Sequence, residues 1–335
     1  MKILLCSHPF PPSVGGIEIA SRIFAEEFAK AGASVTVVTE TPDPSGAVTY
    51  PYAVVRRPHR KQLIALGKQA DIIFQNNIST KTLLPLLALG KPIVVTTQTW
   101  VARNDGSLAW QDRLKRFLML FVHNVAISKA IADTLPKKSI IIPNPFEAEL
   151  FSPFHNLPKP KDIVFLGRLV SDKGCHLALK ALSMLKAEGL TPSFNVIGDG
   201  IERGPLEEMT RELGLTQQVQ FLGNLGAQRA QAIAEHKVMI VPSRWAEPFG
   251  IVALEGIATG CAMVVSSGGG LPDAVGPCGL LFPNGDATAL ANALRRVLTD
   301  DQCRAELTAA GPKHLENFTP QNVAKRYLDL FQQLI

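Results

Sequence analysis

The stretch Ser243-Arg-Trp-Ala-Glu-Pro-Phe-Gly-Ile-Val-Ala-Leu-Glu255 follows an apolar run at 237–242 and leads into a helical pattern at 251–259 that stops at Gly260. The run before it predicts a buried strand, and residues 251–259 predict a helix. In open α/β sheets, ligands bind at the edge where the strands end. The stretch therefore predicts an α/β fold with a ligand site at this turn.

Two carboxylates bracket the turn, Glu247 in the loop and Glu255 in the helix. Between them lie the amides of residues 249–251, at a helix N-terminus that favours anions. Carboxylates accept hydrogen bonds from sugar hydroxyls, and amides donate to a diphosphate, so the order fits a nucleotide-sugar. The alternative is that Glu247 is an ordinary loop charge and Glu255 part of a solvated helix face.

Length and composition set broad limits. A chain of 335 residues exceeds what one core usually supports, which predicts two domains. An apolar fraction of 46% fits a globular protein. A net charge of +5 fits binding to anionic small molecules or to a membrane surface, and is too small to indicate nucleic acid. Five scattered cysteines predict reduced thiols, with no zinc site and no disulfide framework. Reduced thiols are typical of a cytoplasmic protein, which is the location we expect. Residues 1–7 are too short an apolar run for a signal peptide and predict a first buried strand.

Strands alternate with helices on both sides of a proline-rich segment, 143–161. This alternation predicts two doubly wound parallel sheets, that is, two Rossmann-like α/β domains. The prolines place the boundary between a domain at 1–157 and a domain at 158–318.

The N-terminal half offers three features that bear on function. Gly15-Gly16 opens the first helix, where the backbone can come close to a phosphate; a tight turn is the alternative. Gln98 follows a strand that ends at Thr97, so it should face the ligand edge. Trp110–Val122 predicts an amphipathic helix that either covers the sheet or lies on an anionic membrane.

In the C-terminal half, the loop 167–174 also follows a strand and opens a helix. Arg168 and Lys173 in this loop can converge on one pyrophosphate and stabilise it as a leaving group without a metal. For the loop taken alone, the alternative is that Arg168 and Lys173 are surface cations that cap backbone carbonyls. Gly198-Asp-Gly200 predicts a turn. Gly268–Asp273 predicts a third connection from a strand to a helix, where backbone amides could contact sugar hydroxyls or phosphate.

Taken together and in this order, the motifs resemble the retaining glycosyltransferases of the GT-B fold, and within them the large family 4. The resemblance covers nearly the whole chain. Its carriers are Gly15-Gly16, Ser128, Pro143-Asn144, Gly167-Arg168, Lys173-Gly174, Gly198-Asp-Gly200, Pro242-Ser243, Glu247-Pro-Phe-Gly, Glu255, Gly268–Asp273 and Gly279–Asp286.

The resemblance implies two facing domains, with residues 319–335 crossing back to the first. It implies a nucleoside-diphosphate sugar as donor substrate, with no cofactor and no metal. The diphosphate would lie against Arg168 and Lys173, the transferred sugar against Glu247, and the ribose against Glu255. Further contacts with the donor would come from Gly15, Gly16, Gly198, Leu222, Phe249, Gly250 and Ile251.

The expected activity is transfer of a hexosyl unit, with retention, to a hydroxyl of a glycan or a lipid-linked saccharide. Glu247, Arg168, Lys173 and Gln98 are the expected catalytic residues. Gln98 stands where many relatives carry His, and a glutamine cannot hold a positive charge. This departure supports the alternative of a nucleotide-sugar-binding protein that has lost turnover. Two further departures are Asp273 in place of Glu, and Asn144–Glu147 in place of Asn-Gly-Val-Asp.

Overall fold

A computed structural model describes residues 1–43, 46, 48–103 and 106–335. Its contacts divide the chain into two units, Met1–Phe146 with Phe318–Ile335, and Glu147–Asn317. The sequence places the first boundary at 157/158, whereas the structure places it after Phe146. The reason is that α6 (Ala148–Phe151) and the turn Ser152–Phe154 pack on helices of the second unit.

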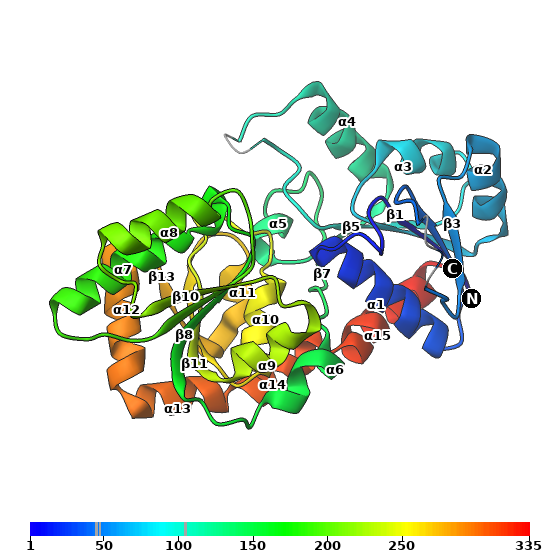
Figure 1. The fold of residues 1–335 in the computed structure, drawn as a ribbon. Helices are drawn as coiled ribbons and strands as arrows, with labels where there is room; N and C mark the ends of the chain where they lie inside the picture. The colour runs from blue at the N-terminus through cyan, green and yellow to red at the C-terminus, as the bar shows by residue number, and fades with distance from the viewer. Residues whose placement is uncertain (44–45, 47, 104–105) are drawn as a thin grey trace. The chain divides into compact units, whose positions relative to one another are not determined.

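The first unit is built on a seven-stranded parallel sheet in the order β3-β2-β1-β4-β5-β6-β7 (Figure 1). Its strands are β1 (Lys2–Ser7), β2 (Ser34–Thr39), β3 (Ala53–Arg56), β4 (Ile72–Asn76), β5 (Ile93–Thr97), β6 (His123–Ala126) and β7 (Ile140–Ile141). Its helices are α1 (Gly16–Lys30), α2 (Arg60–Gln69), α3 (Thr80–Leu87), α4 (Trp110–Leu118), α5 (Lys129–Ala132) and α15 (Pro320–Leu334).

Helices cover both faces of this sheet, and successive residues of a strand point to opposite faces, so each strand contributes to two cores. Ile3 and Leu5 of β1 join the core that α1 and α15 cover. Leu4 and Cys6 join the core that α2 and α3 cover. The central strand β1 therefore carries a continuous apolar run, Ile3–Cys6, as expected for a strand covered on both faces.

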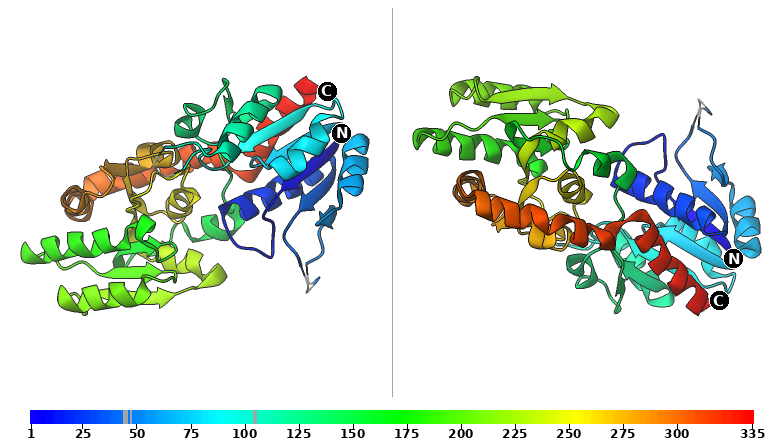
Figure 2. Two further views of the ribbon diagram at one scale, coloured as in Figure 1. Left: turned by 90° about the horizontal axis from the view of Figure 1, so that it is seen from above. Right: turned by 90° about the horizontal axis from the view of Figure 1, so that it is seen from below.

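Helix α15 lies beside α1 in the first unit, as Figure 2 shows. The Thr319 hydroxyl accepts from the Asn322 amide, and Pro320 occupies the first helical position, which begins the helix at this point. Tyr327 is fully buried among Phe24, Phe28 and Phe74 of the first unit, and its hydroxyl lies 2.8 Å from Thr96 Oγ1.

The second unit is built on a six-stranded parallel sheet in the order β10-β9-β8-β11-β12-β13. Its strands are β8 (Lys161–Leu166), β9 (Phe194–Ile197), β10 (Val219–Gly223), β11 (His236–Val241), β12 (Ala262–Ser266) and β13 (Gly279–Phe282). Its main helices are α7 (Cys175–Ala187), α8 (Arg203–Glu212), α9 (Arg229–Ala234), α10 (Ile251–Ala258), α11 (Leu271–Val275), α12 (Ala287–Thr299), α13 (Asp301–Ala309) and α14 (Gly311–Leu315).

The strand order of the second unit reverses between β8 and β11, which are neighbours in the sheet. Such a switch point is where open α/β sheets form a crevice at the carboxyl ends of their strands. The loops that follow β8 and β11 are 167–174 and 242–250. The fold therefore brings the two stretches singled out from the sequence to one place.

All five cysteines are buried thiols without a disulfide. Within the described residues, none of the helices is both long and apolar enough to cross a bilayer.

Candidate functional site

The loops after β8, β11 and β12 are joined backbone to backbone at the carboxyl edge of the second sheet. The Gly270 amide donates to the Glu247 carbonyl at 2.7 Å. Gly174 has φ of +70°, and a Cβ there would lie 1.9 Å from the Pro242 carbonyl oxygen. Only glycine fits such a close approach. The three loops therefore form one surface of fixed shape.

Glu247 is held at both its backbone and its side chain. Its carboxylate oxygen Oε1 accepts from the Ser243 hydroxyl at 2.7 Å and from Lys173 Nζ at 2.5 Å. The residue is only 7% exposed, and its backbone forms a parallel bridge with Gly269. Of the four charged residues predicted to meet, the structure brings this pair into direct contact.

Lys173 and Arg168 lie near opposite ends of the same loop but differ in environment. Lys173 ends the 3-10 turn Ser171–Lys173, and its side chain is 23% exposed. Arg168 is exposed at the start of the loop, directly after Gly167 and close to the end of β8. The Leu169 amide next to it donates to the Asp199 carbonyl at 2.9 Å. Arg168 therefore presents its charge to solvent at the same edge.

Helix α10 begins directly beyond Glu247. Gly250 is its N-cap with φ of +103°, and Ile251 is its first residue. Helix geometry leaves the amides of the first turn without an intrahelical acceptor. The preceding Phe249 is buried. The predicted anion-binding amides therefore lie at a helix N-terminus beside the Lys173–Glu247 pair.

Glu255 lies in α10 and is buried, with 7% of its surface exposed. Burial raises the pKa of its carboxyl to about 7; Arg229 lowers this pKa, and Glu147 raises it further. The Arg229 Nη2 atom lies 4.0 Å from Glu255 Oε1 and 2.8 Å from Glu147 Oε2. The interpretation of Glu255 as part of a solvated helix face is therefore wrong.

The residues predicted to lie near the base belong to the same edge. The Gly198 amide donates to the Gly223 carbonyl at 2.8 Å, and a Cβ on Gly198 would lie 1.9 Å from the Gly167 carbonyl oxygen. Leu222 is half-buried in β10. The turn after β9 thus packs on the loop that carries Arg168.

In the first unit, Gly15 is the N-cap of α1 and Gly16 its first residue. A side chain at Gly15 would meet the Glu18 carboxylate, whose Oε2 would lie 2.5 Å from its Cβ. The Ser13 hydroxyl donates to the other Glu18 oxygen at 3.0 Å. The double glycine therefore accommodates an acidic side chain at the start of this helix.

Gln98 follows β5 and is only 5% exposed. Its side-chain nitrogen donates to Asn76 Oδ1 at 2.7 Å and to Asn144 Oδ1 at 2.8 Å. Asn144 donates back to the Gln98 oxygen at 2.6 Å. Both amide hydrogens of Gln98 are therefore used inside the protein.

The buried polar network extends from Gln98 to α1. Asn76 donates to Ser21 Oγ at 2.6 Å, and Ser21 Oγ lies 2.7 Å from Ser7 Oγ. The network therefore joins the ends of β1, β4 and β5 to Asn144, two residues before the boundary at Phe146.

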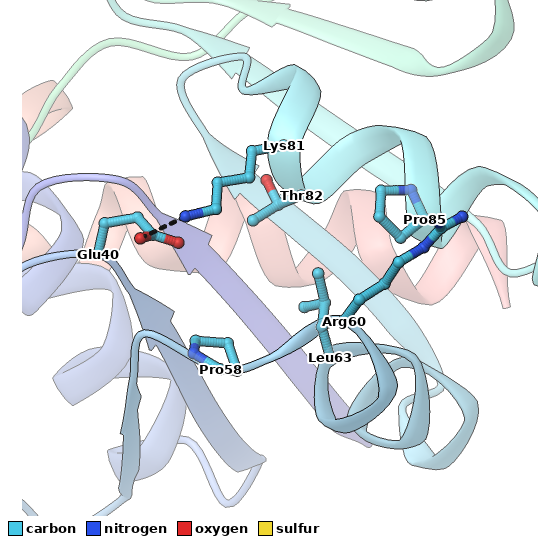
Figure 3. A pocket seen from close by; sticks show the side chains of 7 residues that line it. All are labelled: Glu40, Pro58, Arg60, Leu63, Lys81, Thr82 and Pro85. Carbon is cyan, nitrogen blue, oxygen red and sulfur yellow. Dashed lines mark hydrogen bonds and ion pairs between the residues drawn. The ribbon is translucent and has the colours of Figure 1, made fainter.

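A cavity of about 190 Å³ lies in the first unit, where β2 and β3 end and α2 and α3 begin (Figure 3). Lys81 Nζ contacts Glu40 Oε2 at 2.7 Å on its wall. The lining residues are Glu40, Pro58, Arg60, Leu63, Lys81, Thr82 and Pro85. The cavity contains none of the residues predicted to bind the donor.

Residues 147–314, half of the chain, match the family model described as Glycosyl transferases group 1. The chain belongs to this family. The match coincides with the second unit, Glu147–Asn317, which carries the Lys173–Glu247 pair and Glu255. Family membership therefore rests on the part of the chain that holds the predicted donor residues.

Among curated relatives of this family member, the D-inositol 3-phosphate glycosyltransferase of Corynebacterium urealyticum is 34% identical over 52% of the chain and 43% of the relative. The glycogen synthase of Mycobacterium tuberculosis is 32% identical over 49% of the chain and 41% of the relative. These matches thus span less than half of each relative. The phosphatidyl-myo-inositol mannosyltransferase of Mycolicibacterium smegmatis is 28% identical over 98% of the chain and 92% of the relative.

Among solved structures, Anabaena HepE in complex with UDP matches all of the chain with a TM-score of 0.84 at 20% identity. Sucrose-phosphate synthase from Thermosynechococcus elongatus matches 99% of it with a TM-score of 0.74 at 23% identity. These likenesses concern the fold, and they agree with the predicted GT-B class of two doubly wound parallel sheets.

Two charged residues beside Glu255 were missed by the sequence analysis as site residues. Arg229 starts α9, and Glu147 is the N-cap of α6. They lie 82 positions apart in the sequence and meet at 2.8 Å in the fold. The one signal in the sequence is the departure at Asn144–Glu147, which contains Glu147 but does not relate it to Glu255.

Proposed function

We propose that the chain is a retaining glycosyltransferase that moves a hexosyl unit from a nucleoside-diphosphate sugar to a hydroxyl acceptor. The observation that carries the proposal is the 2.5 Å contact between Lys173 Nζ and Glu247 Oε1, at a switch point and beside a helix N-terminus. A cation for phosphate and a carboxylate for sugar hydroxyls are thereby adjacent. Support comes from the family, from relatives named as transferases, and from a fold neighbour solved with UDP-glucose.

In this proposal, the donor lies along the carboxyl edge of the second sheet. Lys173, Arg168 and the first amides of α10 bind the diphosphate. Glu247 binds hydroxyls of the transferred sugar, and Glu255 accepts from the ribose. The base lies near Gly198 and Leu222.

The chemistry then needs neither a cofactor nor a metal. The bond from the anomeric carbon to the phosphate oxygen breaks, and the acceptor oxygen attacks from the same face. The leaving phosphate takes the acceptor's proton. Lys173 and Arg168 stabilise the negative charge that develops on this phosphate.

The test has two stages. A thermal-shift screen of UDP-, GDP- and ADP-sugars identifies the donor, because a ligand of the folded state raises the melting temperature. Nucleotide release and transfer are then measured with and without EDTA, and the product's anomeric configuration is read by NMR. We expect turnover in EDTA with retention; inversion or a metal requirement would contradict the proposed mechanism.

A matched pair of variants locates the chemistry. Glu247→Gln should lower the transfer rate about 100-fold or more. Glu235→Gln is the control, because Glu235 also pairs with a lysine of the second unit, Lys161, at 2.7 Å. Equal rates for the two variants would show that Glu247 does not act on the sugar.

A second candidate function is nucleotide-sugar binding without turnover. The observation that favours it is Gln98, whose amide hydrogens are both used inside the protein. Donor binding without release of nucleotide for any hydroxyl acceptor would support this function. Detectable sugar transfer would exclude it.

We also propose that the protein is cytoplasmic and contacts an anionic membrane surface through residues Trp110–Val122. Trp110, Phe117 and Phe121 are 71%, 56% and 63% exposed, and Arg113 is exposed between them in the sequence. Exposed aromatic residues with a cation fit the headgroup region of a bilayer.

Vesicle flotation tests this contact. We expect binding to phosphatidylglycerol vesicles, weaker binding to phosphatidylcholine vesicles, and loss in a Trp110→Ser/Phe117→Ser variant. Leu84→Ser is the control, since Leu84 is an exposed apolar residue of another helix, α3. Flotation that does not depend on lipid charge, or that is unchanged in the Trp110→Ser/Phe117→Ser variant, would contradict the contact.

A further inference from the structure

Glu255 shares one cation with a second carboxylate. Arg229 Nη2 lies 2.8 Å from Glu147 Oε2 and 4.0 Å from Glu255 Oε1. The guanidinium also lies over the ring of Phe151, 5.2 Å from its centroid. The three charged side chains are mostly buried, at 22% exposure for Arg229, 19% for Glu147 and 9% for Glu255. The cluster therefore holds one buried and one partly buried carboxylate against one guanidinium.

This arrangement leaves the negative charge of the Glu255 carboxylate only partly compensated. The closer contact goes to Glu147, and the distance to Glu255 is beyond that of a hydrogen bond. Desolvation and a nearby anion both disfavour the ionised form of a carboxyl group, whereas a nearby cation favours it. The pKa of Glu255, about 7, reflects these causes with burial as the largest.

Other titratable groups lie on the elements packed against α10, but Arg229 from α9 and Glu147 from α6 are the charges that act on the pKa of Glu255. His314 of α14 bonds to the Ala274 carbonyl, His236 of β11 to the Ala232 carbonyl, and Lys237 of β11 to Asp162. The remaining ones in these elements are Glu149 of α6, which is exposed, Asp273 of α11 and Lys313 of α14.

We propose that Arg229 is a positioning residue for nucleotide binding, which keeps the Glu255 carboxylate charged for the ribose hydroxyls, and that Glu147 limits this effect by competing for the same guanidinium. The inference rests on the proposed role of Glu255 as a ribose acceptor. A charged acceptor forms a stronger hydrogen bond than a neutral one, so donor affinity should rise as Glu255 ionises.

The two partners should then act in opposite directions. Glu147→Gln removes an anion and releases Arg229, so Glu255 ionises at lower pH and the donor binds well in more acidic solution. Arg229→Met removes the cation, so Glu255 ionises only at higher pH. A purely structural role of the pair would weaken binding in both variants without opposite shifts.

The experiment is calorimetry of donor binding from pH 5.5 to 8.5, with the nucleotide-sugar that gives the largest thermal shift among UDP-glucose, GDP-mannose and ADP-glucose. We expect the pH midpoint of affinity to fall in Glu147→Gln and to rise in Arg229→Met. Near pH 7, Arg229→Met should bind about tenfold more weakly than the wild type and recover at pH 8.5. Arg229→Lys, which keeps the charge, should stay close to the wild type.

Glu188→Gln is the matched control, because Glu188 pairs with Arg295 in the same unit, on its surface. Its midpoint should equal that of the wild type. The carboxyl carbon of Glu255, followed by NMR in the ligand-free protein, gives a second readout that needs no donor. Unshifted midpoints, or shifts in the same direction in both variants, would overturn the inference.

The two proposals fail in distinguishable ways. Wild-type protein that binds none of the nucleotide-sugars would overturn both. A wild type that binds a donor with unmoved midpoints in the variants would overturn only the role of Arg229. If Arg229→Met does not fold, Glu147→Gln and the NMR titration still decide the matter.

Discussion

At the scale of single residues, Glu255 lowers the stability of the folded chain when it is ionised. It is a carboxyl buried in an apolar helix, and its pKa of about 7 exceeds the ordinary 4.5. The folded chain therefore holds this proton more tightly than the unfolded chain between pH 4.5 and 7. The free energy of unfolding should fall as pH rises through this window, because the unfolded state then binds fewer protons. A residue kept at such a cost is typical of a functional site.

The first prediction concerns this residue. Glu255→Gln should raise the free energy of unfolding by about 1–3 kcal/mol at pH 8, and by less near pH 5. The same variant should weaken donor binding by about 1–3 kcal/mol. Urea denaturation at the two pH values and calorimetry check these results. Glu207→Gln, at an exposed pair with Arg203, should change neither quantity. A Glu255→Gln variant that is less stable than the wild type at pH 8 would contradict the argument.

The residues that could be predicted from the sequence are those within one motif. Glu247 and Glu255 stand on either side of one turn, so spacing and helix geometry suffice to relate them. Lys173 was placed beside them by the rule that parallel strands present their carboxyl ends at one edge. Arg229 and Glu147 come from distant elements, and only the packing of α6 and α9 brings them to Glu255. The saturation of the Gln98 amide likewise depends on Asn76 and Asn144, which no local pattern relates.

At the scale of elements, the site depends on close backbone contacts between loops. Gly174 permits the loop after β8 to pack on Pro242 at the end of β11. This approach lies next to Lys173 in the chain, whose side chain contacts Glu247. The surface is thus built before any ligand binds, which limits the ordering that binding requires.

The second prediction tests this packing. Gly174→Ala should lower the free energy of unfolding by about 1–3 kcal/mol and weaken donor binding, since its φ of +70° and the Pro242 carbonyl both oppose a Cβ. Gly204→Ala is the control: it lies in α8 with nothing within 4 Å of its Cβ, and should stabilise by about 0.5–1 kcal/mol. Denaturation curves of both variants give the comparison. Equal effects would show that the loop is not constrained at Gly174.

Helices with clear end signals could be predicted, and those without them could not. Asp286 accepts from the Ala289 amide and caps α12, and Thr319 caps α15, as their residue types indicated. Helix α2 lacks such a signal, because its start is basic and its cap is His59 rather than Ser, Thr, Asp or Asn. Helices α13 and α14 were missed because they follow α12 after short breaks.

At the scale of the whole molecule, the C-terminal helix belongs to the first unit. Tyr327 and Phe331 are fully buried among aromatic rings of that unit. The chain thus enters the second unit once, after Phe146, and leaves it once, before Phe318. The first core is therefore complete only when the last residues of the chain are in place.

The third prediction follows from this dependence. Tyr327→Ala should lower the free energy of unfolding of the first unit by about 3–5 kcal/mol, through the cavity that it leaves. Tyr327→Phe removes only the hydrogen bond to Thr96 and should cost about 1 kcal/mol. Hydrogen exchange of β1 and β5 amides reports on this unit directly. Equal protection in Tyr327→Ala and the wild type would mean that α15 adds little to the core.

The central claim is that a nucleotide-sugar binds along the carboxyl edge of the second sheet. The most direct measurement is a crystal structure of the protein with its donor. We predict that Lys173 and Arg168 nitrogens lie within about 3.2 Å of diphosphate oxygens, and that a Glu255 oxygen lies at a similar distance from the ribose hydroxyls. A donor bound away from these side chains, for example in the cavity beside Lys81, would contradict the account.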